Sequence, residues 1–381
     1  MQKTTSRKFG ISIVWLLILF AVASLRIAAQ DFFDQPLASV NFGADISHIA
    51  WHPGGDIVAV ASSQGIYVLT DTLQAITQLH QSDAMSSVAW NPSGDQLAVA
   101  YDSGIEIWNW DNSTQTFTSM EGALQPDGRD TKLAWSPNGL QLASISLTDP
   151  ALSLGGTTLA IGTVEIWDTI LWTLECTLDD QYIVDTLHYG ADLMDWNPQG
   201  LPTLVIVGNQ GRLDAGDIIV SSELAAFFIN TETGTTIQSI PLFGPFAYSV
   251  GWQPTGNLIG VGGDVGVDIF DVNTRSLVTG FPVGLNIQVM NWNPDGQTLL
   301  GDNIVFSLPA QRALGIFAST AEVVTGEWNP DGKTLIFAGG NGDLQIEDPY
   351  LMPGFDVTPT MTPLPNPTVP PPFLRHDDPC S

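Results

Sequence analysis

The chain has 381 residues, of which 11 are basic and 40 acidic, so its formal net charge is −29. This charge argues against nucleic acid and anionic membranes as partners, because their phosphates would be repelled, and it permits cationic ligands, basic proteins or Ca²⁺. The simpler interpretation of this net charge is an acidic surface that serves solubility alone.

The first 29 residues have the pattern of a secretory signal peptide. Three basic residues precede a thirteen-residue apolar run, 11–23, which is too short for a comfortable membrane span. Small residues offer cleavage after Ala23 or Ala29, and an uncleaved N-terminal anchor is the alternative. Either outcome predicts an extracytoplasmic protein, secreted or associated with the cell surface, that touches a membrane only through this segment.

A Trp-x-Pro-x-Gly motif then occurs seven times, at intervals of 36 to 61 residues. Within each copy Pro presets φ at the second turn position and Gly adopts a backbone conformation that other residues resist, which predicts a hairpin turn. A repeat of about 40 residues is typical of a four-stranded propeller blade. The tryptophans are interpreted as packing residues of the repeat: Trp51, Trp90, Trp135, Trp196, Trp252, Trp292 and Trp328.

Short apolar stretches flank each motif, as 87–90 and 96–100 do in the second unit, and a third strand such as 104–108 follows. These stretches are too short and too rich in β-formers for helices. The sequence therefore predicts an all-β fold over residues 34–349, a seven-bladed β-propeller of four-stranded antiparallel blades. The last unit stops after three strands, so residues 36–40 are expected to supply its outer strand and close the ring.

The repeats resemble the WD40 family, whose units read as an apolar strand, Ser-Pro-Asp-Gly, a small-residue strand and a strand closing on Trp-Asp. The resemblance is strongest at 135–139 followed by Trp167-Asp168. The usual Gly-His dipeptide is missing, with His80 and His188 near its expected place. Periplasmic TolB-like propellers, which carry a similar turn, are the competing resemblance, and both imply the same fold.

Two units are longer than the others, through insertions between their second and third strands at 147–162 and 208–223. Adjacent insertions at one structural position should lie side by side on the rim opposite the motif turns, where repeat folds usually build binding sites. Drift of tolerated loops is the alternative. The contact residues predicted there are Leu152, Leu154, Arg212, Asp214 and Asp217.

No catalytic constellation is recognisable. The five histidines form no metal-ligand pair, and the chain has no Gly-x-Ser-x-Gly elbow. The glycines of 260–266 lead into another strand and are better explained by a hairpin than by a phosphate loop. No catalytic residue, metal ligand or cofactor is predicted.

Residues 350–381 form a tail rich in Pro and Thr, which predicts a disordered, polyproline-like segment without a core. The two cysteines are Cys176, on a predicted outer strand, and Cys380, in the tail. An oxidising compartment would allow them to bridge, yet one such bond is no disulfide framework, and a buried Cys176 with a free or intermolecular Cys380 is the favoured interpretation.

Two functions are compatible with these observations. The first is a noncatalytic propeller that acts as a scaffold and binds a protein or a cell-surface ligand, with a basic or cationic partner favoured by the charge. The second is a propeller hydrolase or lyase acting on carbohydrate, with carboxylates around the central channel. Glycosidases need two acids at a set separation, and a sequence with 40 acidic residues does not decide this point.

Overall fold

The computed structural model describes residues 36–351 except 82, 103, 121, 123, 155–156, 179–180, 186–192, 215–216 and 320. In the outer parts of the strands at 148–161, 181–185 and 210–223 it describes the backbone alone. The predicted signal segment, 1–29, and residues 352–381 of the predicted tail lie outside the described residues.

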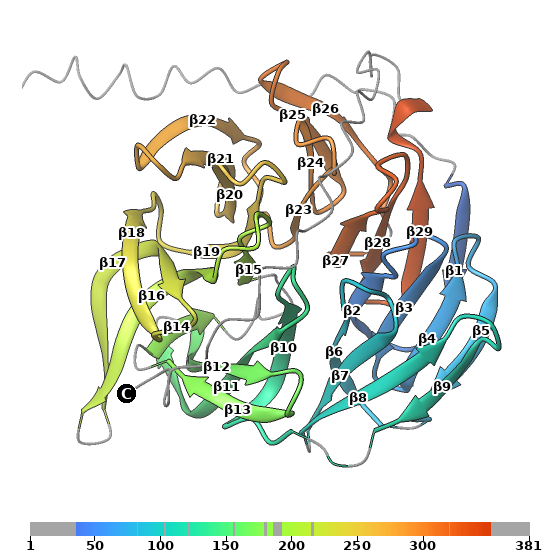
Figure 1. The fold of residues 1–381 in the computed structure, drawn as a ribbon. Helices are drawn as coiled ribbons and strands as arrows, with labels where there is room; N and C mark the ends of the chain where they lie inside the picture. The colour runs from blue at the N-terminus through green and yellow to red at the C-terminus, as the bar shows by residue number, and fades with distance from the viewer. Residues whose placement is uncertain are drawn as a thin grey trace, which may run out of the picture. The chain divides into compact units, whose positions relative to one another are not determined.

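Within the described residues, antiparallel strands form seven blades that follow one another around a ring (Figure 1). Blade 1 holds β2 (Ile46–Trp51), β3 (Ile57–Ser62), β4 (Gly65–Thr70) and β5 (Ala75–Leu79). Blade 2 holds β6 (Met85–Trp90), β7 (Gln96–Tyr101), β8 (Gly104–Asp111) and β9 (Thr116–Ser119). Blade 3 holds β10 (Arg129–Trp135), β11 (Gln141–Leu154), β12 (Thr157–Asp168) and β13 (Thr173–Thr177).

Blade 4 follows the extra strand β14 (Gln181–Asp185) and holds β15 (Met194–Trp196), β16 (Thr203–Asp214), β17 (Asp217–Asn230) and β18 (Thr235–Pro241). Blade 5 holds β19 (Ala247–Trp252), β20 (Leu258–Gly263), β21 (Gly266–Asp271) and β22 (Ser276–Pro282). Blade 6 holds β23 (Met290–Trp292), β24 (Thr298–Gly301), β25 (Ile304–Ser307) and β26 (Arg312–Ile316). The prediction of an all-β fold with seven four-stranded blades is confirmed.

Blade 7 takes strands from both ends of the described chain. It holds β27 (Val323–Trp328), β28 (Leu335–Gly339) and β29 (Asp343–Glu347), and its fourth strand is β1 (Ala38–Asn41). The register between β1 and β29 is antiparallel and pairs Ala38 with Ile346. After β29 a short 3-10 helix, η2 (Pro349–Leu351), ends the described chain.

Every motif glycine adopts the left-handed conformation that the turn requires, with φ between 66° and 76°. A side chain at these positions would be strained, whereas glycine has no Cβ to clash. The turn is closed by the glycine N–H, which donates to the carbonyl of the residue after the tryptophan, as Gly55 does to His52 at 2.8 Å. Each motif therefore joins the first two strands of a blade.

One layer of side chains crosses every blade at the level of the motif tryptophan. The tryptophan on the first strand pairs with a Val, Leu or Ile on the second, as Trp135 does with Leu142. That residue pairs in turn with a large apolar residue on the third strand, which is Trp167 in blade 3. In blade 7 the same register places Glu347 opposite Leu335, so a carboxyl group stands where the other blades have an apolar side chain.

The hydrophobic core is divided among the contacts between neighbouring blades. Side chains of blades 1 and 2 form one cluster around Trp90, and those of blades 7 and 1 form another around Trp51. The remaining interfaces are filled in the same way. Stability therefore comes from stacking each blade on the next, as expected for a repeat fold.

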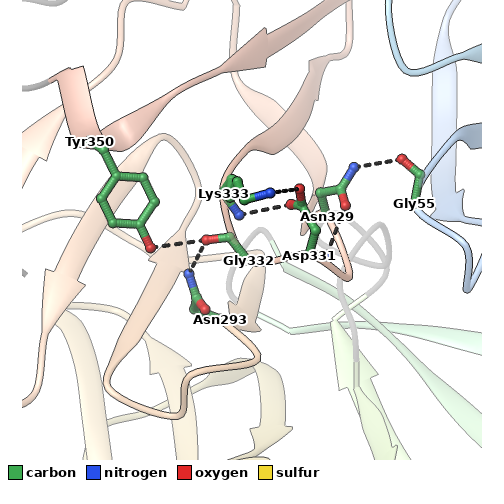
Figure 2. Close-up of polar contacts among 7 residues, drawn as sticks. All are labelled: Gly55, Asn293, Asn329, Asp331, Gly332, Lys333 and Tyr350. Atoms are coloured by element: carbon green, nitrogen blue, oxygen red, sulfur yellow. Dashed lines mark hydrogen bonds and ion pairs between the residues drawn. The ribbon is translucent and has the colours of Figure 1, made fainter. Parts of the chain in front are cut away.

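Hydrogen bonds between the motif turns tie the blades together along one rim, which we call the turn rim. Asn329 of blade 7 donates through Nδ2 to the carbonyl of Gly55 in blade 1 at 2.8 Å (Figure 2). Asn293 donates in the same way to Gly332 at 3.1 Å, and Gln253 donates to Gly296 at 2.6 Å. The residue after each of these tryptophans thus holds the turn of the following blade.

We expect Asn329→Ala to lower the free energy of unfolding by about 2 kcal/mol, because it removes the bond to Gly55 and the bond from the N–H of Asp331 at 2.9 Å. Thermal unfolding followed by circular dichroism measures the loss. Lys333→Ala is the control, since its ion pair with Asp331 is exposed and is worth less than about 1 kcal/mol. Equal effects of the two variants would contradict a role of Asn329 in joining blades 7 and 1.

Candidate functional site

Blades 3 and 4 extend far beyond the others on the rim opposite the motif turns, which we call the hairpin rim (Figure 1). Their second and third strands are 12 or 14 residues long, whereas the corresponding strands elsewhere have 4 to 8. The sequence predicts loops at 147–162 and 208–223, and this is wrong, because both segments are β-hairpins. The β-branched run 218–220 favours a strand, and Gly155-Gly156 stand directly before a second stretch of β-formers, 157–161, which is a hairpin signal.

The strand β14 joins the two long hairpins. It pairs antiparallel with β12, where Ile183 lies opposite Ile161, and antiparallel with β16, where Ile183 lies opposite Asn209. One nine-stranded sheet therefore spans blades 3 and 4. The sequence analysis does not predict β14, whose five residues carry no copy of the motif, although Tyr182, Ile183 and Val184 are strong β-formers.

The five predicted contact residues all lie in the extended parts of these hairpins. In blade 3, Leu152 pairs with Leu159 and Leu154 with Thr157. In blade 4, Arg212 pairs with Ile219, and Asp214 pairs with Asp217 at the end of the hairpin. The structure thus places two residues on one hairpin and three on the other, and their side chains lie outside its description.

Both outer edges of the joined sheet lack a partner strand near the hairpin tips, within the part of the chain that the structure describes. The pairing of β10 with β11 ends at Leu147, which leaves the edge of residues 148–154 open. The pairing of β18 with β17 ends at Ala225, and the N–H of Leu242 still donates to the carbonyl of Leu224, which leaves the edge of residues 217–223 open. Open strand edges present N–H and C=O groups that can pair with another chain.

The centre of the ring encloses a cavity of about 560 Å³, lined by the first strands and the motif turns. Four of the motif tryptophans link neighbouring blades there. Each donates its indole Nε1 to the carbonyl that precedes the tryptophan of the previous blade, as Trp196 does to Ala134 at 2.9 Å and Trp292 to Gly251 at 3.1 Å. The tryptophans are buried packing residues of the channel wall.

Two carboxylates, Asp195 and Glu327, line this channel. Asp195 accepts the main-chain N–H of Trp252 in blade 5 at 2.7 Å, and Glu327 accepts that of Trp51 in blade 1 at 2.8 Å. The amide oxygen of Asn291 accepts the N–H of Trp328 in the same way at 2.9 Å. Both carboxylates therefore hold the next blade in place.

Three carboxyl groups have a pKa near neutrality. Burial raises the pKa of Glu165, Asp302 and Glu347 to about 7 each. They belong to blades 3, 6 and 7 and do not line the channel cavity. The described residues thus do not bring a carboxyl group with raised pKa together with the channel acids, as a glycosidase would need.

His80 has a structural place in blade 2. Its Nε2 lies 2.7 Å from Oε2 of Glu106, whose other oxygen accepts the hydroxyl of Tyr101 at 2.8 Å. Burial, followed by the bond to Glu106, raises the pKa of Tyr101 to about 12. His188 lies outside the described residues.

Among the described residues, no group of three or more His, Cys, Asp or Glu side chains is arranged to hold a metal ion. None of the helices that the structure describes has both the length and the apolar character needed to span a bilayer.

A comparison with protein families matches residues 72–109 to the family described as WD domain, G-beta repeat. The match begins just before β5 and ends within β8, so it covers the outer strand of blade 1 and three strands of blade 2. A comparison with curated proteins found no match. The chain is a seven-bladed β-propeller in which residues 72–109 match the model of the WD40 repeat.

Proposed function

We propose that this protein is a noncatalytic, extracytoplasmic propeller that binds a protein partner through the joined sheet of blades 3 and 4. The observation that carries the proposal is the nine-stranded sheet itself, because β14 merges two neighbouring hairpins into one surface. Propellers with WD40 repeats serve generally as interaction scaffolds. The basic and apolar start of the sequence supports a location outside the cytoplasm.

The open edges suggest how the partner binds. An extended segment of another protein can add a strand to an exposed sheet edge, with main-chain hydrogen bonds giving affinity and alternate side chains giving specificity. The edges at 148–154 and 217–223 offer such positions. Since the chain carries a net charge of −29, a segment with basic residues is favoured.

The test replaces residues 148–161 and 210–223 by two-residue turns, separately and together. We expect the doubly shortened protein to keep the thermal unfolding of the other blades and to lose capture of the partner that the unaltered protein retains from an extracellular extract. Association with that partner should slow as salt rises, because steering by opposite charges is screened. Asp214→Lys combined with Asp217→Lys should reduce this salt dependence.

Substitutions elsewhere provide the control. Ile237→Lys on β18 and Leu277→Lys on β22 change exposed apolar residues outside the hairpins and should leave capture unchanged. Normal capture by the doubly shortened protein would refute the hairpin rim as the binding surface.

The carbohydrate hydrolase or lyase is the less supported function. The channel carboxylates Asp195 and Glu327 both accept main-chain N–H groups, and the carboxyl groups with raised pKa lie elsewhere.

A further inference from the structure

Exposed apolar side chains gather on the turn rim where blades 3 and 4 meet. The residue after the motif glycine is Leu140 in blade 3 and Leu201 in blade 4, and Leu201 is 57 % exposed. At the same position the other blades have polar residues: Asp56, Asp95, Asn257, Gln297 and Lys333. The turn after β12 adds Ile170 and Leu171, which are 65 % and 58 % exposed. With Leu174 on β13, these five residues form what we call the apolar patch.

Hydrogen bonds connect the segments that carry the members of the apolar patch. The N–H of Thr169 donates to the carbonyl of Leu140 at 3.2 Å, which brings the turn after β12 beside the motif turn. Gln141 donates to Glu175 at 2.7 Å and accepts from Thr231 of blade 4 at 2.9 Å. The N–H of Thr231 donates to the carbonyl of Pro202, next to Leu201. Isolated apolar residues on a surface need no explanation, but a contiguous patch marks a contact site.

Cys176 lies on β13, two residues after Leu174. Its side chain is 3 % exposed and is disulfide-bonded, so the interpretation of a Cys176 without a bridge is wrong. The sequence contains one other cysteine, Cys380.

The described chain ends on the turn rim. The hydroxyl of Tyr350 in η2 donates to the carbonyl of Gly332, in the motif turn of blade 7, at 3.0 Å (Figure 2). From Leu351 the chain has 29 residues to reach Cys380, a reach of about 90 Å at about 3.1 Å per residue in polyproline II. A folded unit as long as residues 36–351 is about 50 Å wide, from the usual relation of radius of gyration to chain length. The tail is long enough to cross from blade 7 to blade 3.

We propose that Cys380 is the disulfide partner of Cys176, and that the C-terminal segment 352–379 crosses the turn rim and covers the apolar patch. The composition of the segment fits this surface. Residues 357–376 contain no Asp or Glu, in a chain with 40 acidic residues, and they include Val, Met, Leu and Phe side chains among the prolines. Proline-rich segments bind apolar surfaces at low entropic cost, because their extended conformation is preformed.

The bond forms by thiol–disulfide exchange with an oxidised dithiol protein or a small disulfide. The thiols of Cys176 and Cys380 lose two protons and two electrons in total, and the external disulfide accepts them and becomes two thiols. Such oxidants act outside the cytoplasm, where secreted proteins acquire their disulfides.

The first test maps the bond in the oxidised full chain. Non-reducing peptide mass spectrometry should find Cys176 and Cys380 in one linked peptide. Cys176→Ser, Cys380→Ser and the double variant should each lower Tm by about 8 °C, because the bond closes a loop of about 200 residues in the unfolded chain and the three variants remove the same cross-link. Two titratable thiols in the unreduced, unfolded protein would overturn the proposal, as would dimers linked through Cys380.

The second test asks whether the segment rests on the apolar patch. With the disulfide intact, a chymotrypsin-type protease should cleave after Phe355 or Phe373 at least tenfold faster in Leu171→Asp than in the unaltered protein. Ile237→Asp is the matched control, because Ile237 on β18 is similarly exposed and is not a member of the apolar patch, and this variant should be cleaved at the unaltered rate. Equal rates in all three proteins would overturn the covering of the patch.

Discussion

Replacing Trp252 by alanine is expected to lower the free energy of unfolding by about 3–5 kcal/mol, the usual loss for a large buried aromatic residue. The indole is 5 % exposed and packs edge-on against Phe228, with ring centroids 5.4 Å apart. Its Nε1 also donates to the carbonyl of Asp195 in blade 4 at 3.2 Å. The substitution would thus leave a cavity and break a link between two blades.

Chemical denaturation followed by circular dichroism measures this loss. Trp252→Phe is the control, because it keeps most of the packing and removes the hydrogen bond, for a cost of about 1–2 kcal/mol. An alanine variant as stable as the unaltered protein would mean that the tryptophans of the motif face solvent, and a role as ligand platforms would then replace their role in packing.

Glu347→Leu is expected to raise the free energy of unfolding by about 3 kcal/mol at pH 8. Glu347 is 1 % exposed, and its Oε2 has no hydrogen-bond partner within the described part of the chain. Blades 1 and 4 already have Leu69 and Ile229 at this position, opposite Val58 and Leu204, so the blade geometry accepts an aliphatic side chain. The substitution removes a carboxyl group whose charged form is buried.

The effect depends on pH with a definite sign. Burial raises the pKa of Glu347 from 4.5 to about 7, so the folded state favours the protonated carboxyl. The contribution of Glu347 to the free energy of unfolding is fully present below pH 4.5 and is lost as pH rises to 7. Each unit of difference between the folded and unfolded pKa corresponds to about 1.4 kcal/mol. At pH 4 the protonated Glu347 is neutral, as the amide of Glu347→Gln is, so the variant and the unaltered protein carry the same charge at this position. At pH 8 the variant should have the higher free energy of unfolding, because the carboxylate of the unaltered protein is charged. Unfolding curves at both values test this, and a gain that is the same at both would contradict a titrating Glu347.

The repeat predicted the fold because each motif fixes a local turn by itself. Pro and Gly set the backbone of every Trp-x-Pro-x-Gly copy, and the flanking apolar stretches are strands in the structure. The bonds from Trp196 and Trp292 to the preceding blades could not be predicted, because they depend on how adjacent blades stack around the ring.

The position of the two insertions could be predicted, and their form could not. Their equivalent places in adjacent units locate them on one rim, whereas the expectation of loops at 147–162 and 208–223 gave too little weight to β-branched residues such as Ile218, Ile219 and Val220. The β-formers Tyr182, Ile183 and Val184 favour a strand at Gln181–Asp185, but its pairing with β12 and β16 depends on how blades 3 and 4 lie beside each other and could not be predicted. Glu347 stands out only when the strand register aligns it with Trp167 of blade 3.

The strand β14 also bears on how this chain can change over evolutionary time. In a repeat fold each unit contacts only its neighbours, so the removal of one unit leaves the more distant units unchanged. Here β14 hydrogen-bonds to β12 on one side and to β16 on the other. Loss of either blade would strip pairing from the other, so blades 3 and 4 are expected to be inherited as one module of the ring.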